Sequence, residues 1–190
     1  MVKSKKKFFP FVLDHATHSA VEGQAELYEK YPRIHLERVT PVMALDCEMV
    51  RANRNDGSLN KKGNPACFTV LGRLSLVNDR QETVLDVFVA NDDCVSITNT
   101  NLRFSGIRWK NLDPKNGAMP FHKVLDLLYE ILEGKTLVGH AIENDLKVLK
   151  LIEVHAKSQC QYRSAGDLGV TLCDTQRLFQ GAWPSPDATK

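Results

Sequence analysis

Two acidic residues one position apart, Asp46 and Glu48, follow an apolar run at residues 42–45 that is typical of a buried strand. Side chains alternate between the faces of a strand, so both carboxylates project from one face, while Cys47 and Met49 project from the other. Two like charges at this spacing repel, and burying them is costly unless a cation neutralises them or the strand opens to water. The pair therefore indicates either a divalent-cation site or two solvated acids at a strand tip.

A third acid, Asp145, lies near the start of a helix expected after a short apolar strand at residues 137–140. Such helix starts gather at the carboxyl edge of a parallel sheet, where the strand of Asp46 and Glu48 also ends. Mg²⁺ prefers carboxylate oxygens, and two such ions can activate water and stabilise the leaving oxygen of a phosphodiester. The alternative for Asp145 alone is an acid that complements the helix dipole.

The elements that must position these acids change in type along the chain. Apolar alternation predicts strands in the first half, and apolar residues at three- and four-residue spacing predict helices between later strands. This order favours an α/β fold with a mixed sheet and flanking helices, in which the later strands are added in parallel through right-handed crossovers. The expected elements are strands at residues 42–50, 67–77, 83–90, 137–140 and 169–173 and helices at residues 20–31, 121–132 and 146–152.

Composition excludes several classes of protein. The 190 residues are 43% hydrophobic and 25% charged, which is typical of a globular domain and of neither a disordered nor a membrane protein. The five cysteines include no C-x-x-C pair, so we expect no zinc or redox centre and a reducing compartment. The apolar residues 8–13 are too few for a signal sequence or a membrane span, so we expect no membrane partner.

The first seven residues form a basic cluster with four lysines. This pattern suits a nuclear import signal or an electrostatic arm for nucleic acid, and it suits a solvated tail equally. The expected organisation is a basic N-terminal tail and helical extension at residues 1–40, a domain at residues 41–179 and an irregular tail at residues 180–190.

Several ordered motifs resemble those of the DEDD-type RNA exonucleases, and in particular the eukaryotic subgroup linked to ribosomal RNA processing. The resemblance covers about residues 42 to 179, through residues 44–50, 72–78, 105–107, 137–141, 144–149 and 174–175. It implies a ribonuclease H-like sheet, a nuclear or nucleolar location, and 3′-to-5′ removal of nucleotides from a single-stranded RNA end with two Mg²⁺ or Mn²⁺ ions. By position, Asp46 and Glu48 match the first acidic motif and Asp145 matches the acid of the second, as catalytic and metal-binding residues.

The chain departs from the family at the third motif, a His followed five positions later by an Asp. No such pair follows the second motif within the 190 residues, so we expect a C-terminally incomplete fold with reduced or lost activity. His140 and Asp145 have this spacing but belong to the second motif. For His140 we expect a hydrogen-bonded histidine at a strand end, and contact with substrate or water is the alternative.

Other residues could contact substrate. The resemblance implies that residues near Met49 touch the terminal nucleotide, whereas core packing explains the same residue. Phe104, Arg108, Trp109 and Lys110 combine aromatic and basic side chains that could stack on and neutralise a single strand, or lie in an ordinary surface loop. The alternatives to an exonuclease are a catalytically silent RNA- or protein-binding protein and a truncated product, and a protein partner would cover the incomplete sheet.

Overall fold

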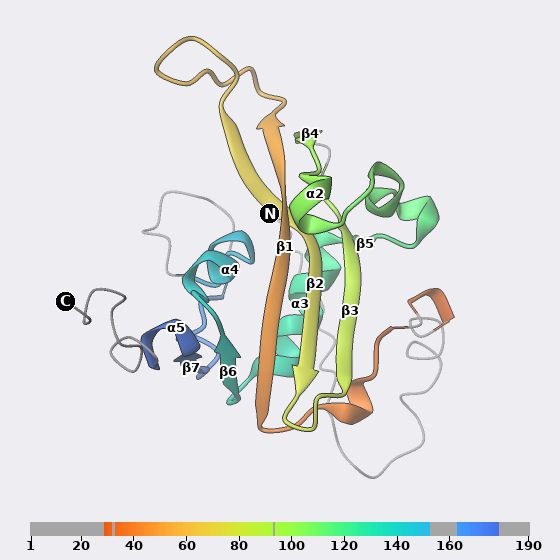
Figure 1. Ribbon diagram of the computed structural model, residues 1–190, viewed down its shortest axis with the longest axis vertical. Coiled ribbons are helices and arrows are strands. Elements are labelled where there is room, and N and C mark those ends of the chain that lie inside the picture. Colours follow the sequence, from red (N-terminus) through yellow and green to blue (C-terminus); the bar gives the residue numbers. More distant parts are fainter. Residues whose placement is uncertain (1–28, 32, 93, 153–162, 179–190) are drawn as a thin grey trace, which may run out of the picture.

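The sheet is the framework of this chain, and Figure 1 shows its strands side by side with helices around them. The computed structural model describes residues 29–31, 33–92, 94–152 and 163–178. Within them the sheet has the order β5-β3-β2-β1-β6-β7, and β4 pairs with the far part of β1. The strands are β1 (Val42–Arg54), β2 (Cys67–Asn78), β3 (Thr83–Ala90), β4 (Val95–Asn99), β5 (Met119–Pro120), β6 (Thr136–Gly139) and β7 (Thr171–Asp174).

The described helices connect these strands. They are α2 (Leu102–Ser105), α3 (Phe121–Leu132), α4 (Glu143–Val148) and α5 (Thr175–Leu178), with 3₁₀ turns η1 (Leu36–Arg38), η2 (Trp109–Leu112) and η3 (Pro114–Asn116). β1 pairs antiparallel with β2, and β2 with β3, while β6 and β7 are added in parallel. The predicted mixed α/β sheet is confirmed.

One face of the sheet carries the main core. Helix α3 buries the apolar stripe predicted from its spacing, including Val124 and Leu128, against inward side chains of the central strands, such as Leu45 and Leu74. Residues Ile34 and Leu36 of the N-terminal extension join this core. The proposed domain boundaries are otherwise untested, since residues 1–28 and 179–190 lie outside the described residues. No described helix has the length and apolar character needed to cross a membrane.

The outer edge of β1 is paired at both ends and unpaired between them. β6 pairs with β1 at Val42 to Ala44, and β4 pairs with it from Arg51 onward. β6 ends at Gly139, where the chain turns away from the sheet. Residues 45–50 therefore form a gap in the ladder along this edge, and we refer to them as the β1 gap. The two strand acids lie within it.

Two predicted boundaries differ from the structure, and two elements were not predicted. The second helix was predicted over residues 146–152, but α4 ends at Val148, and Lys150 adopts a positive φ of 55°. β1 was predicted to end at Val50, but it runs on to Arg54 because β2 and β4 continue to pair with it. The short elements β4 and α2 were not predicted. For the helix expected at residues 20–31, only residues 29–31 are described; residues 29 and 30 are helical and Tyr31 is not.

Candidate active site

Asp145 reaches the β1 gap from α4. Its Oδ1 accepts a hydrogen bond from the backbone N–H of Cys47 at 3.1 Å, and the side chain is buried. The N–H of Cys47 points to the edge where β6 no longer pairs, so the carboxylate takes the position of a ladder acceptor. The acid of the second motif is therefore held against Cys47, the residue between the two strand acids, and so lies at the same sheet edge as those acids.

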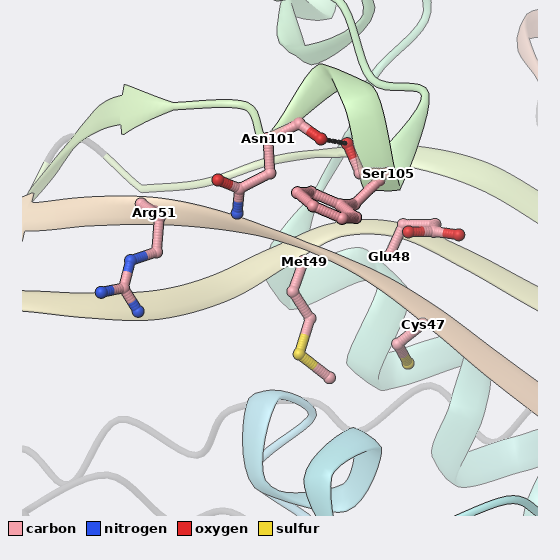
Figure 2. Close-up of a pocket in the computed structure, with 7 residues that line it drawn as sticks. Cys47, Glu48, Met49, Arg51, Asn101 and Ser105 are labelled. Atoms are coloured by element: carbon pink, nitrogen blue, oxygen red, sulfur yellow. Dashed lines mark hydrogen bonds between the residues drawn. The ribbon is translucent and has the colours of Figure 1, made fainter.

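Asp46 and Glu48 lie on one face of β1, and Cys47 and Met49 lie on the other. Asp46 is exposed, Glu48 is half-buried and Cys47 is buried. Figure 2 shows Glu48 on one side of the strand and the side chains of Cys47 and Met49 on the opposite side. The predicted alternation is confirmed.

The opposite strand supplies a cation to the acidic face. Arg73 of β2 pairs in register with Glu48, so their side chains share this face. Its guanidinium forms a two-pronged contact with Asp86 of β3, Nε to Oδ1 at 2.7 Å and Nη2 to Oδ2 at 2.9 Å, and it lies 5.6 Å from the ring centroid of Phe88. The contacts with Asp86 and with the ring of Phe88 hold the positive charge of Arg73 in place near Glu48.

The three acids influence one another electrostatically. Burial raises the pKa of Asp145, and the negative charge of Asp46 raises it further, while the N–H of Cys47 opposes the shift. Burial and the charge of Asp46 also raise the pKa of Glu48, against the opposing effect of Arg73. The site therefore concentrates negative charge, which is the electrostatic condition that favours a bound cation.

The donor set fits a hard divalent ion in chemical type. Carboxylate oxygens come from one exposed, one half-buried and one buried side chain. Burial and neighbouring negative charge raise the pKa of Glu48 and of Asp145. The spacing is looser than a closed centre, because within the described ranges no three His, Cys, Asp or Glu side chains lie close enough to hold a metal ion. Asp145 in particular has one oxygen committed to Cys47.

A cavity opens at the β1 gap beside the acids. It has a volume of about 510 Å³ and is lined by Cys47, Glu48, Met49, Arg51, Asn101, Phe104 and Ser105. α2 lies against β1 and forms the other wall (Figure 2). Met49 both lines this cavity and packs against the main core. Its predicted contact with substrate stays a prediction.

The wall formed by α2 depends on close packing of residues 105–107 on β2. An extra residue of β2, Gly72, lies opposite the step from Glu48 to Met49. A Cβ at Gly72 would come within 2.6 Å of Ile107 Cδ1 and 2.8 Å of Val50 Cγ1. The glycine therefore allows the turn after α2 to approach the sheet on the face that carries Glu48.

His140 lies at the end of β6 and is exposed. Its Nδ1 is 3.1 Å from Thr175 Oγ1, which in turn donates to the carbonyl of Gly139. Asp174, at the end of β7, accepts from the N–H of Ala141 at 2.9 Å. The predicted hydrogen-bonded strand-end histidine is present, and its contact with substrate stays a prediction. The role of Asp174 in holding the turn before α4 was not predicted, although its motif was noted.

The geometry defines the class of protein: a ribonuclease H-like α/β domain in which acids from the first strand and a later helix meet at one sheet edge. Among solved structures, the Saccharomyces cerevisiae Pan2 pseudoubiquitin hydrolase-RNA exonuclease module in complex with AAGGA RNA has a TM-score of 0.50 at 20% identity, over 75% of this chain and 22% of that chain. This similarity shows the fold.

Curated relatives identify the family. Mouse RNA exonuclease 4 is 38% identical over 139 residues, which is 70% of this chain and 29% of the relative. Human RNA exonuclease 4 is 37% identical over 113 residues, which is 60% of this chain and 23% of the relative. The Bos taurus interferon-stimulated 20 kDa exonuclease-like 2 is 33% identical over 129 residues, which is 68% of this chain and 32% of the relative. No protein-family profile matches. This chain belongs to the DEDD-type exonuclease family, and it spans less than a third of the length of these relatives.

Proposed function

We propose that this chain acts on single-stranded RNA ends as a 3′-to-5′ exonuclease that hydrolyses phosphodiester bonds with two divalent ions. The observation that carries the proposal is the contact between Asp145 Oδ1 and the N–H of Cys47, which places the helix acid between the two strand acids. The names of the curated relatives support an RNA substrate.

The three acids differ in exposure and therefore in their proposed roles. Asp46 is exposed and Glu48 half-buried, so their oxygens remain accessible to a bound ion and to the substrate phosphate. Asp145 is buried and is held by Cys47 through Oδ1. Mg²⁺ or Mn²⁺ held by these three residues would activate water and stabilise the leaving oxygen. The cavity beside Glu48 and Met49 would receive the terminal nucleotide.

The third motif of the family bears on the rate of the proposed cleavage. The three acids come from the first two motifs, and the 190 residues contain no third-motif pair of His and Asp. A general base contributes about 10²–10⁴-fold to such reactions, so we expect slow cleavage by this chain alone. The second candidate, favoured by the same observation, is a catalytically silent protein that binds RNA or a protein partner through the retained fold.

Cleavage of labelled RNA separates the two candidates. With Mg²⁺ or Mn²⁺, 3′-labelled RNA should release labelled mononucleotide first, while 5′-labelled RNA should shorten stepwise. Asp46→Asn, Glu48→Gln and Asp145→Asn should each reduce the rate by about 10²-fold or more, and the exposed turn variant Asp79→Asn should match the wild type. If the wild type cleaves no faster than Asp46→Asn, the exonuclease proposal is rejected.

A measurement of metal binding that does not depend on turnover supports this test. Ion binding to the folded state alone stabilises it by about 2.7 kcal/mol at a concentration 100 times the Kd. Mn²⁺ should therefore raise the melting temperature of the wild type and of Asp79→Asn, and it should have a smaller effect on Asp145→Asn. Equal shifts in all three proteins would show that the ion binds elsewhere.

A role in ribosomal RNA processing and a nuclear or nucleolar location belong to the same proposal. They rest on the family resemblance and on the lysines of residues 3–7. A fluorescent fusion should enter the nucleus, and replacement of these lysines by glutamine should reduce its import. Unchanged import would remove the basic cluster from the proposal.

A further inference from the structure

An exposed aromatic and basic segment leads away from the cavity. It comprises residues 102–110, which form α2 and the start of η2, and we call it the α2–η2 segment. Phe104 is 84% exposed and Trp109 is 58% exposed. Large aromatic side chains so exposed and so near each other in sequence are costly to leave in water, which indicates a surface that binds a partner.

The α2–η2 segment also carries positive charge, and no acidic residue lies within it. Residues 94–112 contain Arg103, Arg108 and Lys110 and no acidic residue. All three cations are exposed, and within the described part of the chain none of them forms an ion pair. Unpaired cations interleaved with exposed aromatic rings match the chemistry of an unpaired nucleic-acid strand, which presents phosphates and bases alternately.

The path of the segment connects it to the acids. α2 lies against β1, and η2 lies against β3, so the segment leads from one of these strands to the other (Figure 1). Between them Ile107 is fully buried and contacts the face that carries Val50 and Glu48. Phe104 lines the cavity at the β1 gap, whereas Trp109 lies beyond it. The segment thus begins at the candidate active site and leads away from it.

We propose that the α2–η2 segment is a track for the single-stranded RNA that precedes the reacting 3′ end, a proposal that rests on the function proposed above. Phe104 and Trp109 stack on bases, and Arg103, Arg108 and Lys110 contact phosphates. Phe104 and Trp109 are five positions apart, so their Cα atoms lie at most about 18 Å apart, which is within the span of a few nucleotides. The track predicts a substrate with several unpaired 3′ nucleotides, because a duplex end cannot offer bases for stacking.

RNA binding without cleavage tests the track directly. The probe is a 5′-fluorescein-labelled unstructured RNA of 12 nucleotides, titrated with the full chain in EDTA and followed by anisotropy. Phe104→Ala and Trp109→Ala should each weaken binding about 5- to 100-fold, and Trp109→Phe should retain most of it. The matched control Leu59→Ala removes another exposed apolar side chain, 61% exposed, and should leave binding unchanged.

The salt dependence tests the charged half of the track. Loss of each phosphate contact should reduce the slope of log K against log salt concentration by about 0.7. Arg108→Gln and Lys110→Gln should therefore flatten the slope, and Lys62→Gln, an exposed lysine in the loop after β1, should not. Unchanged slopes together with unchanged affinity of Trp109→Ala would overturn the proposal. Loss of a protein partner in Trp109→Ala with intact RNA binding would also overturn it, in favour of a protein-docking surface.

Failure of the track and failure of the exonuclease proposal give different results. If the wild type does not cleave RNA but Trp109→Ala binds it more weakly, the track stands and the exonuclease proposal falls. If the wild type cleaves RNA and Trp109→Ala has the same KM on single-stranded RNA, the track falls. A duplex with a 3′ overhang of one nucleotide should be a poorer substrate than one with an overhang of six nucleotides, and equal KM values for both would again reject the track.

Discussion

Replacement of Asp145 by asparagine should stabilise this protein while it removes the proposed activity. The asparagine Oδ1 can accept the same hydrogen bond from the N–H of Cys47, which now measures 3.1 Å. The change removes a buried charge whose pKa is raised by burial and by the charge of Asp46. The wild-type site therefore holds an unfavourable negative charge, which the isosteric amide lacks.

The two contributions of Asp145 to stability, its charge and its hydrogen bond, can be separated by comparing Asp145→Asn with Asp145→Ala. Relief of destabilising groups in active sites commonly yields about 0.5–2 kcal/mol, which corresponds to roughly 2–4 °C per kcal/mol in a protein of this size. Asp145→Ala relieves the same charge but leaves the N–H of Cys47 without its acceptor, at a cost of about 1–3 kcal/mol. We expect Asp145→Asn to be more stable than the wild type, and Asp145→Ala to be less stable than Asp145→Asn by about 1–3 kcal/mol.

The pH dependence of stability tests whether the charge of Asp145 causes this difference. Because the folded-state pKa of Asp145 lies above its ordinary value of 3.8, stability contributed by the protonated form is lost as pH rises through the folded pKa. The advantage of Asp145→Asn should be greatest near pH 7 and should fade below about pH 4. Thermal and urea unfolding in EDTA measure it. An asparagine variant less stable than the wild type at pH 7, or an advantage that persists unchanged at pH 3.5, would refute this reasoning.

Three further predictions concern the surroundings of the site. Gly139→Ala should lower the unfolding free energy by about 1–3 kcal/mol, because its Cβ would lie 2.7 Å from Ile142 Cγ1. Ile142→Ala should then lower the unfolding free energy less in the Gly139→Ala background than in the wild type, which a double-mutant cycle in urea measures. Arg73→Gln should raise the pKa of Glu48 further, because Arg73 lowers it, and an unchanged carboxyl titration by carbon NMR would contradict this. Leu128→Ala should cost about 2–5 kcal/mol in urea unfolding, since this α3 residue is fully buried, and a smaller loss would show that the core collapses around it.

The sequence predicted the elements whose side-chain pattern is strong. α3 agrees with its predicted bounds because its apolar stripe is continuous. α4 is shorter than predicted, although Leu149 and Leu151 are buried as expected. Apolar spacing reports which residues are buried, and it does not report where the backbone leaves the helix, here at Lys150 with its positive φ. β4 escaped prediction because it has only five residues, and none of them is buried.

The candidate site was predictable in its residues and less so in its geometry. Alternation along β1 placed Asp46 and Glu48 on one face, and the structure agrees. The hydrogen bond between Asp145 and Cys47 could not be predicted, because it depends on β6 ending at Gly139 beside β1. The track was visible only as aromatic and basic residues, since its direction depends on α2 contacting β1 and η2 contacting β3.

The interruption in pairing along β1 has a consequence for solubility. A bare stretch of strand edge offers its amides and carbonyls to any extended chain nearby, and such edges seed sheet-to-sheet aggregation. Here the stretch is short, it is bounded by β6 and β4, it carries two acids, and one of its amides is occupied by Asp145. The same carboxylates proposed for chemistry thus protect the fold against intermolecular strand addition, and a variant that removes them together would be prone to self-association.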